Sequence, residues 1–262
     1  MIGIMLKKRF RFGTSILALA FSLSVITGGV GVSASGIDNT EDYIPEGFTV
    51  TKVYNETDPE YFVKDKKASV FTPDTLSSFV ESAVDGDEST KVEIKTLEDK
   101  TYKLRDIKNL ETGEEATQYR TDVSIMALQS DDKYDPTGGV KLTITIYSTD
   151  YDNDMYTAMD KVYVRWDRED STISSATSTL AILQVGPAKS GSRMDQKIID
   201  DNDAANPWNI SFGNTYLFQV NSYGWEPVLK SGAFTQVGAK IYYYVKTRVN
   251  HLEFYLWYND FW

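Results

Sequence analysis

Residues 140–147 read Val-Lys-Leu-Thr-Ile-Thr-Ile-Tyr, and residues 162–167 read Val-Tyr-Val-Arg-Trp-Asp. In both stretches apolar side chains alternate with polar ones, which is the period of a β-strand with one buried face. Further strands are expected over residues 178–185, 209–212 and 215–221. Repeated strands with turn residues between them predict an antiparallel β-sandwich over residues 135–262.

The chain before this region has a different pattern. Thr72 can cap a helix, Pro73 suits its first turn, and apolar residues then recur at helical spacing. Strands are expected at residues 91–95, 102–106 and 121–128, with a turn at residues 109–115. Residues 130–139 combine aspartates, a proline and two glycines, so we place a boundary near residue 135. Residues 61–134 are therefore expected to form a small α+β region.

The last two strands allow a prediction of their pairing. If Asn250 and His251 form a two-residue turn, Tyr244 lies opposite Trp257 and Lys246 lies opposite Tyr255. This pairing keeps the two faces of the hairpin distinct, whereas a slip by one residue mixes them.

The N-terminus has the order of a secretory signal. A cationic cluster at residues 7–11 precedes an apolar run at residues 16–26, and the small residues Val32 and Ala34 suit signal peptidase. We expect residues 1–34 to be a signal peptide cleaved after Ala34, which makes the protein secreted and extracellular. The alternative is a retained membrane anchor, but a spanning helix needs about 20 apolar residues. Residues 35–60 are polar and acidic, and we expect a loosely ordered leader there.

Charge and cysteine content limit the classes of function. The chain carries 27 basic and 38 acidic residues, a net charge of −11, and no cysteine. Cleavage of the signal peptide would remove four basic residues, so the net charge of the mature protein would be 23 − 38 = −15. A protein this acidic gains no free energy from counterion release on nucleic acid, and anionic lipids repel it. We therefore expect neither nucleic-acid binding nor membrane insertion after signal cleavage.

Three features together resemble a known group of proteins: the run 135–141 (Asp-Pro-Thr-Gly-Gly-Val-Lys), the run 166–171 (Trp-Asp-Arg-Glu-Asp-Ser) and the closing β-hairpin. This is a diffuse group of uncharacterised, β-rich secreted proteins of Gram-positive bacteria. The resemblance implies export and a β fold, and the group has no assigned activity.

The sequence offers little for nucleophilic or zinc catalysis. Its single histidine, His251, is expected at an exposed hairpin tip, where it cannot align a serine nucleophile. One histidine without cysteines also cannot build the usual three-ligand zinc site. Glycoside hydrolysis needs only two carboxylates at a set separation, and that possibility stays open.

One acidic cluster has the spacing of oxygen ligands for calcium. Asp150, Asp152 and Asp154 alternate in a loop between two predicted strands. The loop is not an EF-hand, because Met155 stands where that motif needs glycine. Asp200, Asp201 and Asp203 would complete the site if the two loops met. The alternative is an ordinary hydrophilic loop without a bound ion; we expect no other cofactor.

The closing hairpin concentrates aromatic residues on one of its faces: Tyr242, Tyr244, Tyr255 and Trp257. A flat patch of exposed rings with hydrogen-bonding edges suits stacking on sugars. The alternative is that this face is buried under another part of the chain.

The pattern as a whole favours a secreted, non-catalytic binding module for a cell-envelope glycan or protein surface. An extracellular hydrolase that uses paired carboxylates is the alternative hypothesis.

Overall fold

The computed structural model describes residues 43–63, 91–130, 139–171, 173–197, 208–230, 235–247 and 253–261. These residues form antiparallel β-sheets, with one short 3-10 helix, η1 (Val220–Tyr223). Within the described residues, no helix has the length and apolar character needed to cross a membrane.

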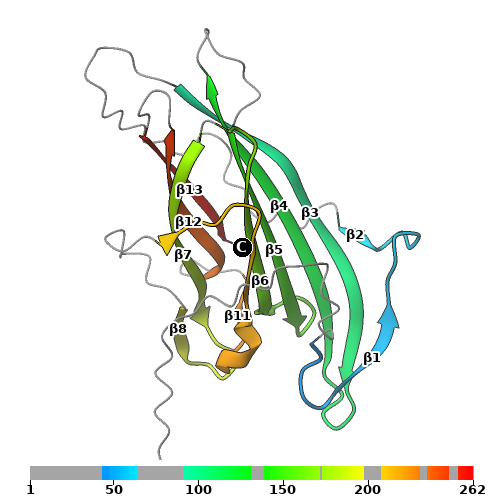
Figure 1. The fold of residues 1–262 in the computed structure, drawn as a ribbon. Helices are drawn as coiled ribbons and strands as arrows, with labels where there is room; N and C mark the ends of the chain where they lie inside the picture. The colour runs from blue at the N-terminus through cyan, green and yellow to red at the C-terminus, as the bar shows by residue number, and fades with distance from the viewer. Residues whose placement is uncertain are drawn as a thin grey trace, which may run out of the picture. The chain divides into compact units, whose positions relative to one another are not determined.

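The larger sheet has eight strands, and its central part is a meander of long neighbouring strands (Figure 1). The strand order is β1, β3, β4, β5, β6 and β10, in which the long strands β3 to β6 each pair with the next one along the chain; β2 also pairs with β3, and β11 with β6. The bounds are β1 Phe48–Val53, β2 Phe62–Val63, β3 Lys91–Asn109, β4 Glu115–Ser130, β5 Gly139–Tyr151, β6 Tyr156–Arg168, β10 Thr215–Phe218 and β11 Val228–Leu229.

The smaller sheet has five strands in the order β13, β12, β7 and β8, with β9 also paired to β7. The chain enters this sheet after β6, returns to the larger sheet for β10 and β11, and ends in the smaller one (Figure 1). The bounds are β7 Ile173–Pro187, β8 Arg193–Lys197, β9 Trp208–Asn209, β12 Gln236–Thr247 and β13 Glu253–Phe261.

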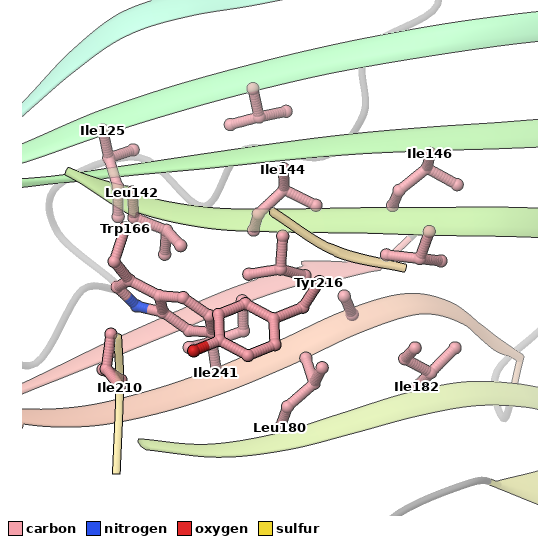
Figure 2. Close-up of a cluster of buried hydrophobic side chains, with 14 of the residues drawn as sticks. Ile125, Leu142, Ile144, Ile146, Trp166, Leu180, Ile182, Ile210, Tyr216 and Ile241 are labelled. Carbon is pink, nitrogen blue, oxygen red and sulfur yellow. The ribbon is translucent and has the colours of Figure 1, made fainter. Parts of the chain in front are cut away.

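The core lies between the two sheets, as the alternating pattern predicts. Ile144 and Trp166 from the larger sheet share one buried cluster with Leu180 and Ile241 from the smaller sheet (Figure 2). The Trp166 ring meets the ring of Tyr216 edge to face, with centroids 5.5 Å apart. Two antiparallel sheets around a shared apolar layer are the arrangement of a β-sandwich, which confirms the predicted fold class.

The sandwich begins earlier in the chain than predicted. β4 and β5 pair along their length across the boundary expected near residue 135, and the described residues belong to one compact unit. The α+β region therefore supplies strands of the same sheet, because β4 has its own apolar face to bury in the shared core. The helix expected from Thr72 lies outside the described residues.

The acidic leader is also more ordered than expected over part of its length. Residues 48–53 form β1, which pairs with β3, and Tyr54 is buried after it. The Tyr54 hydroxyl donates to Asp106 Oδ2 over 2.5 Å and receives a bond from Lys103 Nζ over 2.7 Å. A buried tyrosine with its hydroxyl paired anchors this segment in spite of its low apolar content.

The closing hairpin forms in a register different from the predicted one. Tyr244 pairs with Tyr255, and Tyr242 pairs with Trp257, so the partners are displaced by two residues from the expected register. The two-residue turn proposed at Asn250 and His251 lies outside the described residues. An even displacement leaves every residue on its predicted face, because side chains alternate with a period of two.

Candidate functional site

An aligned row of rings and cations crosses the outer face of the larger sheet. Register pairs Phe62 with Tyr102, Tyr102 with Arg120, Arg120 with Tyr147, and Tyr147 with Lys161. We call these five residues, from β2 to β6, the cross-strand ladder. They point away from the core by strand alternation, because Ile146 and Val162, the neighbours of Tyr147 and Lys161, are core residues.

Close contacts join the members of the ladder. The Arg120 guanidinium lies 4.7 Å from the centre of the Tyr102 ring, and Lys161 Nζ lies 4.3 Å from the centre of the Tyr147 ring. Such cation–π contacts hold long side chains in place and limit the freedom that a ligand would otherwise have to remove. The Tyr163 ring extends the row, with its centroid 6.0 Å from that of Tyr147.

The β2 end of the ladder is an aromatic cluster. The ring centroids of Tyr61 and Phe62 lie 5.2 and 6.1 Å from that of Tyr102. Phe62 keeps 41% of its surface exposed, which is high for a phenylalanine. This end therefore offers accessible ring surface, whereas Lys161 at the other end is 7% exposed.

The tyrosines of the ladder stay neutral at physiological pH. Burial raises the pKa of the Tyr147 phenol, against the opposing effect of Arg120, and burial likewise raises the pKa of Tyr102. A neutral phenol both donates and accepts a hydrogen bond. Arg120 has its charge balanced by Asp122 at 3.0 Å, and Asp122 also accepts a bond from Thr145 over 2.8 Å.

A small pocket adjoins the Lys161 end of the ladder. Its volume is about 10 Å³, roughly the space that one water molecule needs. Tyr147 and Lys161 belong to both the ladder and the pocket. The full lining is Tyr43, Leu104, Arg105, Gln118, Tyr119, Tyr147, Asp160 and Lys161.

Asp160 reaches this pocket because it is the extra residue of a β-bulge. The pairing of β5 with β6 passes from Tyr147–Lys161 to Ser148–Met159, so Asp160 has no partner in register. A bulge lets one more side chain project to the outer face than regular pairing allows. No feature of the sequence marks the bulge in advance.

The Asp160 carboxylate is buried and hydrogen-bonded. Its Oδ2 accepts from Thr149 Oγ1 over 2.8 Å and lies 3.4 Å from Gln118 Nε2. The pKa of the Asp160 carboxyl is raised to about 7, mainly by burial. The charge of Asp150 also raises it, while the Thr149 hydrogen bond, Arg105 and Lys161 lower it. The group therefore titrates near neutral pH.

The aspartates predicted to bind calcium each have a different neighbour. Asp150 pairs with Lys230, with Oδ2 and Nζ 2.5 Å apart. Asp152 pairs with Lys189 at 3.0 Å, and Lys189 also pairs with Glu114.

The third aspartate of that set, Asp154, accepts a hydrogen bond from the Tyr119 hydroxyl over 3.4 Å. Residues 152–154 all have positive φ, between 52° and 66°. Among the described residues, no three histidine or acidic side chains converge as a metal site requires. Asp200, Asp201 and Asp203 lie outside the described residues, so the calcium hypothesis stays a prediction.

Register brings the predicted aromatic residues of the hairpin together on the backbone. Tyr242 pairs with Trp257, and Tyr244 pairs with Tyr255, on strands β12 and β13. The side chains of these four residues lie outside the described part of the structure, so exposure of this aromatic face stays a prediction.

Sequence reasoning missed the ladder and the pocket. The polar side of each strand is visible in the alternation, but the alignment of Tyr102, Arg120, Tyr147 and Lys161 depends on three registers between strands. Bulges within β3 and β6 shift those registers by one residue. Aromatic and basic residues at the polar positions of successive strands were the one available signal.

Comparison of the chain with protein-family models, with curated proteins and with solved structures finds no match.

Proposed function

We propose that this protein is an exported, non-catalytic binding module, and that its outer face holds an extended glycan of the cell envelope along the cross-strand ladder. The observation that supports this proposal is the alignment of Phe62, Tyr102, Arg120, Tyr147 and Lys161 across five strands. The predicted signal peptide supports export, and the chemistry of the outer face supports a glycan as the ligand.

The spacing of the ladder suits a linear polymer of rings. Neighbouring strands are about 4.8 Å apart, so successive ladder residues recur at about that interval. One sugar unit of an extended chain has a similar length. A glycan that lies perpendicular to the strands would therefore meet one ladder residue with each unit.

The two ends of the ladder offer different interactions. Phe62 and Tyr61 at the β2 end provide ring surface on which the C–H face of a sugar can stack. Arg120, Tyr147 and Lys161 provide hydrogen-bonding groups toward the pocket. Sugars combine apolar ring faces with hydroxyl edges, so this combination fits a glycan better than a purely apolar partner.

Hydrolysis by paired carboxylates has less support. Asp150 and Asp160 are the buried carboxylates among the described residues. Asp150 lies an even number of residues from the core residue Ile146 in β5, so alternation places both side chains on the inner face of the sheet. Thr149 lies on the outer face, and Asp160 contacts it there. The two carboxylates therefore lie on opposite faces of the sheet, and one glycosidic bond cannot lie between them.

The test is retention of residues 35–262 on purified peptidoglycan, cellulose and chitin. We expect the wild type to be retained on at least one matrix and Phe62→Ala/Tyr102→Ala to lose about tenfold or more in affinity, because stacking contacts are removed. Tyr223→Ala is the matched control, since Tyr223 is 52% exposed and lies outside the ladder.

A second double variant separates the two candidate aromatic faces. Tyr244→Ala/Trp257→Ala changes the closing hairpin and leaves the ladder intact, so we expect its retention to match the wild type. Loss of retention in this variant alone would transfer the glycan site to the hairpin. Absence of retention on every matrix would contradict glycan binding altogether.

A further inference from the structure

We propose that Gln118, in the pocket that Arg105 and Lys161 also line, forms a subsite that takes a single hydroxyl group of the bound glycan. This inference rests on the proposed function and adds a specificity element to it. It is carried by a buried acceptor without a donor, by the size of the adjoining pocket and by the position of that pocket at the ladder.

Hydrogen bonding determines the orientation of the Gln118 amide. Its Nε2 lies 2.9 Å from the Tyr43 carbonyl oxygen and 2.9 Å from Thr149 Oγ1, in addition to its contact with Asp160. The reverse orientation would place the amide oxygen against a carbonyl oxygen and a carboxylate. The amide oxygen therefore lies on the other side, away from these acceptors.

That amide oxygen needs a hydrogen-bond donor. Gln118 is 3% exposed, and its Oε1 is buried without a hydrogen-bond partner among the described residues. A buried acceptor that lacks a donor costs free energy, so such groups are normally paired with protein, water or ligand. Gln118 also lines the pocket, which is where a donor can be placed.

The size of the pocket and its lining select the group that fits. A volume of about 10 Å³ admits one oxygen-sized group and excludes a sugar ring. A hydroxyl can donate to the Gln118 amide oxygen and also accept from a cation of the lining, Arg105 or Lys161. A carboxylate has no proton to donate, and an N-acetyl group is too large.

The pocket is placed where a glycan on the ladder would reach it. Tyr147 and Lys161 line the pocket and also form the last two positions of the ladder. A sugar unit beside Tyr147 can therefore direct one hydroxyl inward, in place of a water molecule that would occupy the pocket in the free protein.

The test compares the wild type with Gln118→Met on two probes: native peptidoglycan, and the same peptidoglycan after chemical O-acetylation of its free hydroxyls. We expect wild-type affinity to fall about tenfold on the acetylated probe. Gln118→Met, which keeps the side-chain length but has no acceptor, should bind native peptidoglycan about tenfold more weakly and lose little more on acetylation.

Each outcome bears on a separate claim. Equal wild-type affinity for the two probes overturns the subsite and leaves glycan binding in place. A further tenfold loss of affinity by the Gln118→Met variant on the acetylated probe also overturns the subsite, because the hydroxyl whose acetylation matters would then bind elsewhere. No wild-type retention on native peptidoglycan, cellulose or chitin overturns the proposed function and the subsite with it. The wild-type comparison needs no variant, so a fold defect in Gln118→Met does not remove the test.

Discussion

Lys230 Nζ lies 2.5 Å from Asp150 Oδ2, and this ion pair joins the end of β11 to the end of β5. The Asp150 side chain is 1% exposed and that of Lys230 is 17% exposed. Water therefore screens this pair far less than it screens the exposed pair of Lys52 with Glu60. The pair connects two segments that are 80 residues apart in the chain.

Replacement of Lys230 tests the energetic role of this pair. Lys230→Met should lower the free energy of unfolding by about 3 kcal/mol, because it leaves the Asp150 carboxylate buried without its cation. The measurement is urea unfolding at neutral pH. Lys52→Met is the control and should change stability by less than about 1 kcal/mol. A double variant, Lys230→Met/Asp150→Asn, should recover much of the loss, and failure to recover would contradict the charge-based explanation.

Asp160 should make stability depend on pH. Its pKa is about 7 in the folded chain, against an ordinary value of 3.8, so the folded state holds more protons than the unfolded state between those values. Stability should therefore fall as pH rises from about 4 to 7, by up to about 4 kcal/mol for this group. Arg105, Lys161 and Asp150 are the charged groups that act on it, and Tyr43 and Tyr151 are neighbouring phenols whose pKa is raised by burial and by the charge of Asp160.

The variant that checks this dependence is Asp160→Asn, which cannot ionise. It should unfold in urea like the wild type at pH 4 and be more stable by about 2 to 4 kcal/mol at pH 8. Asp167→Asn, which changes a half-buried carboxylate paired with Arg165 near the end of β6, serves as a control with no comparable pH-dependent change. Parallel pH profiles for the wild type and Asp160→Asn would show that the carboxyl titrates at an ordinary value.

Gln184 links the two sheets through a buried amide. It is fully buried in β7, accepts a bond from the Met159 N–H over 2.7 Å, and donates to the Glu226 carbonyl over 2.8 Å. Gln184→Leu should cost about 2 to 4 kcal/mol in urea unfolding, because the buried Met159 N–H loses its acceptor and the Glu226 carbonyl loses one of its two donors. Gln196→Leu is the matched control, since the half-buried Gln196 also bonds Glu226 but can be replaced by water. Equal losses for the two variants would argue against burial as the cause.

The register of the closing hairpin can be tested with engineered cysteines, because the chain has none of its own. Tyr244→Cys/Tyr255→Cys places the thiols on directly paired residues and should oxidise to an intramolecular disulfide. Tyr244→Cys/Trp257→Cys should oxidise far less, because that pair is diagonal and about 7 Å apart. Thiol titration after mild oxidation measures both. Preferential cross-linking of the second pair would restore the register predicted from the sequence.

The local alternation of residues 140–147 and 162–167 predicted β5 and β6 correctly, and it identified Ile144, Ile146 and Trp166 as inward-facing. The turn around Gly113 was also predictable, because its positive φ favours glycine. The strand boundaries were less predictable from the sequence. Three short strands predicted between residues 91 and 128 are parts of β3 and β4. Bulges in their pairing let these long strands continue where the alternation of apolar and polar residues is interrupted.

The amino-acid sequence by itself determined the strand character, the inward and outward side of each strand, and the antiparallel fold class, because these depend on a local period of two. Only the tertiary structure decided which strands are neighbours and in which register they pair. Those choices placed Tyr102, Arg120, Tyr147 and Lys161 in one row and turned Asp160 toward the pocket. The physical reason is that register depends on bulges, loop lengths and packing between distant segments, which the pattern within a single strand does not contain.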